Sequence, residues 1–329
     1  MPKVIVKPNK NVFLLYALLT ALHIDRITAL KLLVAHPLRN QTAAHFQSYA
    51  NPDLDVTRIS ELPSKYFYVL TLNEAPNFSP KWEPPKDWTA ESLEQFQKLA
   101  GDFLPYLEHF YNNTDFEAFY QGILPGYQAE CDALQAIVDR ANLPSILDAA
   151  WEEHFDFSME IIPMPLEGKG SGVGPRVGNI TYQIIGPPFT KRALYLIAHE
   201  ASHPRARNVL APIAEEIGKR KYLEDYARQR VSYKTNVYSW PGYFEEQFMD
   251  ALQIASIEPA LRGMHPEPFE KQLTVKKRLK WYAHWGKFYI RDFYAEIKQY
   301  KATHAQKNLV EVGLSILTRL EKKYKPMME

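Results

Sequence analysis

Residues 196–204 read LIAHEASHP, and within them His199, Glu200 and His203 form an HExxH motif. Residues four apart on an α-helix lie on the same face, one turn above the other. Two imidazoles placed in this way can bind one metal ion, and Glu200, displaced by one position, can act on a water molecule beside that ion. The apolar run ALYLIA directly before the motif predicts a buried helix that carries all three side chains.

The composition restricts how such a metal could be held. The chain of 329 residues has one cysteine, Cys131, so the ligands must come from His, Asp or Glu. A catalytic zinc ion takes three protein ligands, so the two histidines need a third partner, and we expect one Zn²⁺ per chain. Pro204 disfavours helical backbone at the residue before it, so we expect the helix to end near His203.

The third ligand is expected from a second helix, WPGYFEEQFMDALQI at residues 240–254. Its apolar positions recur with helical spacing, and Pro241 suits the first turn of a helix. Glu246 is the predicted ligand, with Asp250 one turn further along the same face. There Asp250 would accept the free N–H of a ligand histidine. Glu245, one residue away, remains the alternative to Glu246.

A hydrolytic site also needs a group that stabilises the oxyanion. Tyrosine is one of the side chains that serve as such a donor. Tyr238, eight residues before Glu246, is the first candidate, followed by Tyr233 and Tyr243.

An extended segment before the motif is expected to bind the substrate. The stretch NITYQIIG, residues 179–186, is rich in β-branched residues and predicts an edge strand that offers main-chain hydrogen bonds to a peptide. The expected substrate-binding residues are Asn179, Ile180, Thr181 and Tyr182. The glycine-rich stretch at residues 168–178 predicts a mobile loop that could act as a lid.

The order of elements predicts an α+β protein that is predominantly α-helical with a small β-sheet. We expect an N-terminal helical region at residues 1–155, a catalytic core at 156–262 and a basic helical region at 263–329, together forming one compact unit. The run from Val12 to Leu22 imitates a signal peptide. It lacks a cleavage site, however, and is too short to span a bilayer, so it predicts a mature amphipathic helix and, by default, a cytoplasmic protein.

HExxH followed by a distant glutamate helix resembles the gluzincin peptidases. HEASHP with EEQFMDALQI some forty residues later is similar to a bacterial domain family of unknown function that is classed among the metallopeptidases. The resemblance implies a zincin-like core, with His199, His203 and Glu246 as zinc ligands and Glu200 as the catalytic base. The expected partner is a peptide or protein substrate. Asp250 departs from that family, which often has arginine there.

Two other functions compete with this interpretation. Residues 271–329 contain 14 Lys and Arg against five Asp and Glu, with aromatics between them, which is also typical of nucleic-acid binding. The whole chain carries a net charge of only +1, so the rest of the chain is acidic. We therefore expect the basic helices to form a layer that covers this acidic remainder, and we expect no nucleic-acid partner. The second alternative is an inactive zincin that serves as a binding scaffold.

Overall fold

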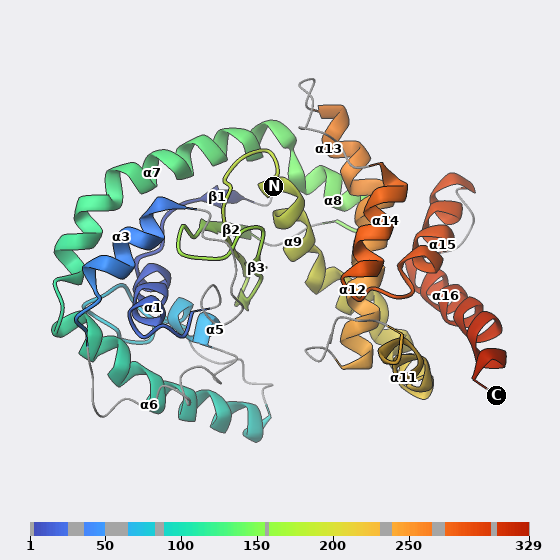
Figure 1. The fold of residues 1–329 in the computed structure, drawn as a ribbon, viewed down its shortest axis with the longest axis horizontal. Coiled ribbons are helices and arrows are strands. Elements are labelled where there is room, and N and C mark those ends of the chain that lie inside the picture. Colours follow the sequence, from blue (N-terminus) through green and yellow to red (C-terminus); the bar gives the residue numbers. More distant parts are fainter. Residues whose placement is uncertain are drawn as a thin grey trace. The chain divides into compact units, whose positions relative to one another are not determined.

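The computed structural model describes residues 3–25, 36–49, 65–82, 89–154, 158–230, 239–264, 274–303 and 308–328. The predicted fold class is confirmed at this level, because these residues form a mostly helical α+β protein with a small mixed sheet (Figure 1). The chain divides into two compact units. One comprises Met1–Asp139 and Asp156–Ile197, and the other comprises Arg140–Phe155 and Ala198–Glu329. The boundaries of these two units differ from those of the three regions expected from the sequence. Each unit contains two separate segments of the chain, because the chain passes from one unit to the other more than once.

The first unit contains the sheet. Its strands are β1 (Val4–Val6), β2 (Ser158–Pro163), β3 (Gly172–Val173), β4 (Arg176–Val177) and β5 (Ile180–Ile185). The strands β1, β2 and β5 lie parallel in that order, whereas β3 and β4 both pair antiparallel with β5. The two longest strands, β2 and β5, were predicted from their apolar β-branched residues. The short strand β1 was not.

The prediction that β5 is an edge strand is wrong. Its register with β2 joins Ser158 to Ile180, and on its other side Val177 pairs with Ile180. The glycine-rich stretch expected to be a lid therefore supplies β3 and β4, which fold back on β5 as a hairpin. Gly178, with φ of +58°, stands in the two-residue turn, where a left-handed backbone favours glycine. A hydrogen-bonded neighbour thus occupies the side that a peptide would need.

The helices of the first unit are α1 (Lys10–Ala21), α3 (Pro37–His45), α5 (Lys65–Leu70), α6 (Ala90–Asn112) and α7 (Phe116–Ala141). The apolar N-terminal run forms a helix, α1, as expected, but every residue of this helix is buried, so the prediction that it is amphipathic is wrong. Even Lys10 is enclosed, because its ammonium group lies 2.5 Å from a Glu117 carboxylate oxygen and donates to the Ala75 carbonyl. Among the described residues, no helix is both long and apolar enough to cross a membrane.

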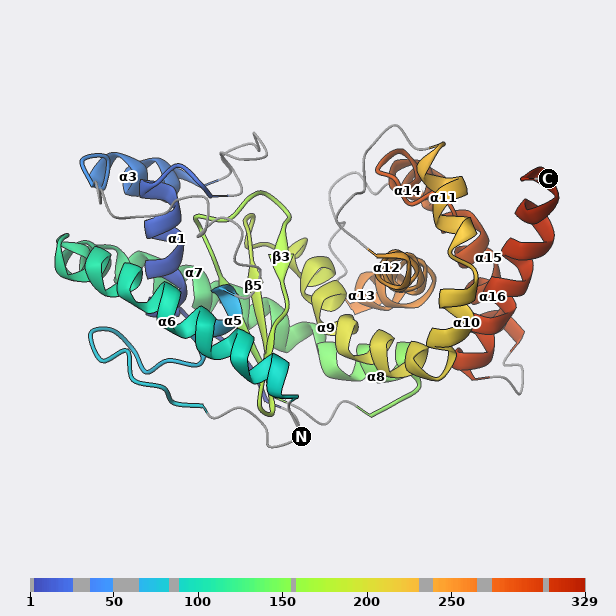
Figure 2. The same cartoon turned by 90° about the horizontal axis from the view of Figure 1, so that it is seen from below.

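The second unit is helical. Its helices are α8 (Leu143–Trp151), α10 (Ala214–Lys219), α11 (Tyr222–Arg228), α12 (Trp240–Leu252), α13 (Glu258–Met264), α14 (Val275–His284), α15 (Ile290–Thr303) and α16 (Leu309–Tyr324). A π-helical turn at Gln253–Ile257 joins α12 to α13, and short 3-10 turns lie at Ala211–Ile213 and Lys325–Met327. The predicted glutamate helix is thus confirmed as α12. It packs on α15 through Phe244 and Phe293, whose ring centroids are 4.7 Å apart, and α16 lies beside α15 (Figure 2).

The HExxH motif lies on α9 (Ala193–Leu210), which starts in the first unit and continues into the second. The prediction that this helix ends near His203 is wrong, since α9 runs through Pro204 for six more residues. A proline inside a helix removes the hydrogen bond to the carbonyl four residues earlier, here that of Glu200. Contacts beyond the proline hold the helix together, because Arg205 is buried and its guanidinium lies 3.0 Å from a Glu153 carboxylate oxygen.

Candidate metal centre

The rotation of α9 is fixed by small buried residues on one of its faces. Ala198, Ala201 and Ser202 are almost completely buried. The Trp151 indole N–H of α8 donates to the Ser202 hydroxyl over 3.0 Å, and that hydroxyl donates to the Ala198 carbonyl over 2.7 Å. At 100° per residue, the motif side chains at positions 199, 200 and 203 therefore project from the opposite side of the helix.

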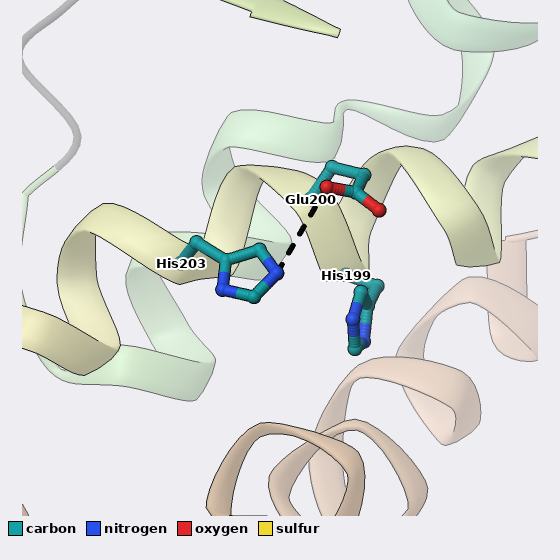
Figure 3. Close-up of side chains that lie close together, drawn as sticks. All are labelled: His199, Glu200 and His203. Atoms are coloured by element: carbon teal, nitrogen blue, oxygen red, sulfur yellow. Dashed lines mark ion pairs between the residues drawn. The ribbon is translucent and has the colours of Figure 1, made fainter. Parts of the chain in front are cut away.

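The three motif side chains lie close together (Figure 3). The imidazole centroids of His199 and His203 are 5.2 Å apart, with the rings nearly perpendicular. Glu200 Oε2 lies 3.9 Å from His203 Nε2. One potential ligand atom from each residue lies within 4.8 Å of the others, and no other group of His, Cys, Asp and Glu in the described ranges does the same.

The helix α12 adds carboxylates that orient both imidazoles. His203 Nδ1 lies 2.7 Å from Glu245 Oε1, and His199 Nδ1 lies 3.3 Å from Asp250 Oδ1. A carboxylate can only accept a hydrogen bond, so the Nδ1 atoms carry the protons. When the rings are neutral, each Nε2 atom therefore holds a lone pair. This is the tautomer that a metal-binding histidine needs when it coordinates through Nε2.

Both Nε2 atoms face the same carboxylate, that of Glu246. His199 Nε2 lies 3.6 Å from Glu246 Oε2, and His203 Nε2 lies 3.6 Å from Glu246 Oε1. Ligand atoms placed 2.0–2.1 Å from a tetrahedral zinc ion are about 3.3–3.4 Å apart. Each 3.6 Å separation is close to this value, but the two involve different oxygen atoms of Glu246, and Glu246 does not belong to the group whose ligand atoms all lie within 4.8 Å of one another. Glu246 therefore stays the predicted third ligand. Glu245 instead accepts the Nδ1 proton of His203.

Sequence reasoning missed Lys287, which lies in the same cluster. Its ammonium nitrogen is 2.8 Å from Glu246 Oε2 and 3.1 Å from Asp250 Oδ2. The loop after α14 delivers it, because the Tyr243 hydroxyl of α12 donates to the Gly286 carbonyl over 2.5 Å and accepts the Phe288 N–H over 2.9 Å. No local pattern could have found this lysine, since it stands in a basic stretch and is forty-one residues from Glu246.

The charged groups of the cluster shift one another's pKa values. Burial opposes the charge of His199, but the hydrogen bond with Asp250 and nearby carboxylates outweigh burial and raise the pKa of the imidazole to about 9. Burial likewise opposes the charge of Asp250, yet Lys287 and His199 lower the pKa of this carboxyl group to about 2. The same lysine and imidazoles lower the pKa of Glu246.

Four carboxylates gather at this cluster, those of Glu200, Glu245, Glu246 and Asp250. In the described part of the chain, the cations that contact them include Lys287 and the exposed Arg207, which lies 3.3 Å from Glu245 Oε1. A divalent cation bound by His199, His203 and Glu246 would add positive charge where these carboxylates gather.

The remaining predicted site residues are not part of this cluster. Tyr238 and its alternative Tyr233 lie outside the described residues. Tyr243 is buried, and its hydroxyl group holds the loop that carries Lys287. The residues expected to bind substrate, at positions 179–182, belong to the β5 hairpin of the first unit, where Thr181 and Tyr182 are buried.

Comparison with protein families, with curated proteins and with solved structures gives no match. The resemblance to gluzincin peptidases therefore stays a prediction that depends on the motifs and on the geometry of this cluster.

Proposed function

We propose that this chain is a zinc-dependent metallopeptidase of the gluzincin type with a zincin-like core. The observation that carries the proposal is the orientation of the two imidazoles. Both Nε2 atoms face Glu246 at 3.6 Å, while each Nδ1 atom faces a different carboxylate. His199, His203 and Glu246 would hold one zinc ion. Asp250 and Glu245 would keep the imidazoles in the required tautomer.

The chemistry follows from the position of Glu200. A zinc ion at this site would supply a more acidic water molecule and polarise a peptide carbonyl. The Glu200 side chain is only 8% exposed, and its Oε2 atom lies 3.9 Å from His203 Nε2. It is placed to accept a proton from the attacking water and to pass it to the leaving amine. Tyr238 stays the proposed oxyanion donor, because its sequence position is close to α12.

A second candidate is an inactive scaffold whose ion-pair cluster needs no metal. Lys287 favours this candidate, because its ammonium group already neutralises part of the charge on Glu246 and Asp250. An ion-pair network alone does not explain why both Nε2 atoms face one carboxylate, or why each Nδ1 atom is oriented by a different one. The metal site explains both features, and we therefore prefer it.

The test is peptide hydrolysis by the zinc-loaded protein and its Glu200→Gln variant. A mixed peptide library, analysed by mass spectrometry, serves as substrate because the cleavage preference is open. We expect Glu200→Gln to retain zinc and to lose turnover by a factor of about 10²–10⁴. Glu215→Gln is the matched control, since this glutamate is 83% exposed on α10 and should leave turnover unchanged. Equal turnover in wild type and Glu200→Gln would refute the proposal.

A further inference from the structure

Helix α14 presents a cationic face at the surface of the second unit. None of its residues is fully buried. Its inward side carries Arg278, which forms an ion pair with the buried Glu258, and Tyr282 lies one turn further on that side. At 100° per residue, the opposite arc of the helix forms what we call the α14 outer face. Lys276, Lys277 and Lys280 lie on this arc, and the exposed Trp281 at its border is counted with them.

The lysines of the α14 outer face stand in a strongly basic part of the sequence. All three are exposed, and within the described part of the chain none of them makes an ion pair or a side-chain hydrogen bond. The sequence explains this, because residues 271–291 contain seven Lys and Arg and no Asp or Glu. Elsewhere in the unit, Lys323 and Arg319 are paired with Asp292. The uncompensated charge of α14 is therefore complementary to an anionic partner.

Two exposed indoles flank these lysines. Trp281 is 48% exposed and Trp285, just after the helix, is 44% exposed. Their ring centroids are 5.8 Å apart with planes tilted by 50°, so the two rings form one apolar block. An indole combines an apolar body with an N–H donor and is enriched at the boundary between lipid and water. Large exposed aromatic groups of this kind mark interaction sites.

We infer that the α14 outer face, with Trp285, binds an anionic lipid surface. A basic helix that carries tryptophan can lie in the membrane interface, with its lysines near the headgroups and its indoles among the upper acyl carbons. The two indoles favour lipid over nucleic acid, because tryptophan is enriched at the boundary between lipid and water. Since the two rings pack against each other, they would enter that boundary together.

Sedimentation of the full-length protein with lipid vesicles tests this inference. We compare vesicles of phosphatidylcholine alone with vesicles of equimolar phosphatidylcholine and phosphatidylserine. The wild type is expected to bind the second kind and to dissociate at high salt. Replacing Lys276, Lys277 and Lys280 by alanine should weaken binding about a hundredfold, since each lysine near an anionic surface contributes roughly fivefold. A Trp281→Ala and Trp285→Ala double variant should also lose binding, and it tests the apolar contribution separately.

A second triple variant removes the same charge elsewhere in the unit. Lys221, Lys298 and Lys322 are exposed on other elements, and their replacement by alanine should preserve vesicle binding to within about twofold. Equal losses in the two triple variants would overturn the inference, because overall charge would then explain the binding. No binding to the phosphatidylserine vesicles, or binding only to a DNA or RNA oligonucleotide in the same assay, would overturn it as well.

Discussion

Two of the charged clusters that the structure describes in the second unit are built on different principles. In one, Asp292 of α15 accepts hydrogen bonds from Lys323 at 2.9 Å, from Arg319 at 3.2 Å and from the Tyr324 hydroxyl at 2.8 Å. A single acid thus has three donors, all from α16. In the candidate metal centre, the carboxylates of Glu245, Glu246 and Asp250 instead gather around two imidazoles, the partly buried Lys287 and the exposed Arg207. One cluster thus surrounds a single acid with donors, whereas the other brings several acids to a pair of histidines. The second arrangement is the one expected of a metal site.

The largest expected difference concerns the lysine of each cluster. In metal-free protein, Lys287→Met leaves the buried Glu246 and Asp250 without their shared cation and should cost roughly 3–5 kcal/mol of unfolding free energy. Lys323→Met should cost much less, because Arg319 and Tyr324 still donate to Asp292. Urea unfolding in the presence of a chelator measures both. Equal losses would mean that the two clusters are equivalent.

Zinc should act on one cluster alone. At a free zinc concentration a hundred times its Kd, the wild type should gain about 2.7 kcal/mol of stability. A His199→Ala and His203→Ala double variant should show no gain, whereas Arg319→Met should gain as much as the wild type. Urea unfolding with and without zinc measures the gain. An unchanged gain in the double variant would place any zinc elsewhere.

The pH dependence of the metal-free protein should also reveal the negative cluster. The pKa of His199 is raised from its ordinary 6.5 to about 9, chiefly by Asp250 against the effect of burial. A raised histidine pKa contributes stability that is fully present below pH 6.5 and is lost as the pH rises towards 9. We expect a loss of about 2 kcal/mol over this window, absent in His199→Ala. Chelator-treated samples unfolded at a series of pH values show whether the loss occurs.

The smallest effect is expected at the carboxylates that orient the imidazoles. Asp250→Asn and Glu245→Gln should each weaken zinc binding about tenfold, because they perturb the tautomer and orientation of a ligand without removing it. Competition with a chromophoric chelator measures the affinity. Glu296→Gln is the control, since Glu296 pairs with Arg319 beside the other cluster. A loss in Glu296→Gln as large as in Asp250→Asn would contradict the assigned roles.

The sequence predicted those parts of the fold and site that depend on local spacing. The four-residue spacing of His199 and His203 places them on one face of a helix, and the same spacing relates Glu246 to Asp250. The choice between Glu245 and Glu246 depends on how α12 is rotated toward α9, which the local spacing does not specify.

Contacts between distant segments could not be predicted in this way. The glycine-rich stretch pairs with β5 because the chain turns back at Gly178. From its composition alone, this stretch is predicted to be a loop. Lys287 reaches the site through hydrogen bonds between Tyr243 and the loop after α14. The burial of α1 on all sides depends on neighbouring helices that its own sequence does not specify.

The central claim is that two histidines and Glu246 hold one zinc ion. The most direct measurement is elemental analysis of protein reconstituted with zinc and then desalted, for the wild type, Glu246→Ala and Glu245→Ala. One zinc ion per chain in the wild type and in Glu245→Ala, with none in Glu246→Ala, is the predicted result. A wild type that holds no zinc after reconstitution would contradict the claim and leave the cluster as a network of ion pairs.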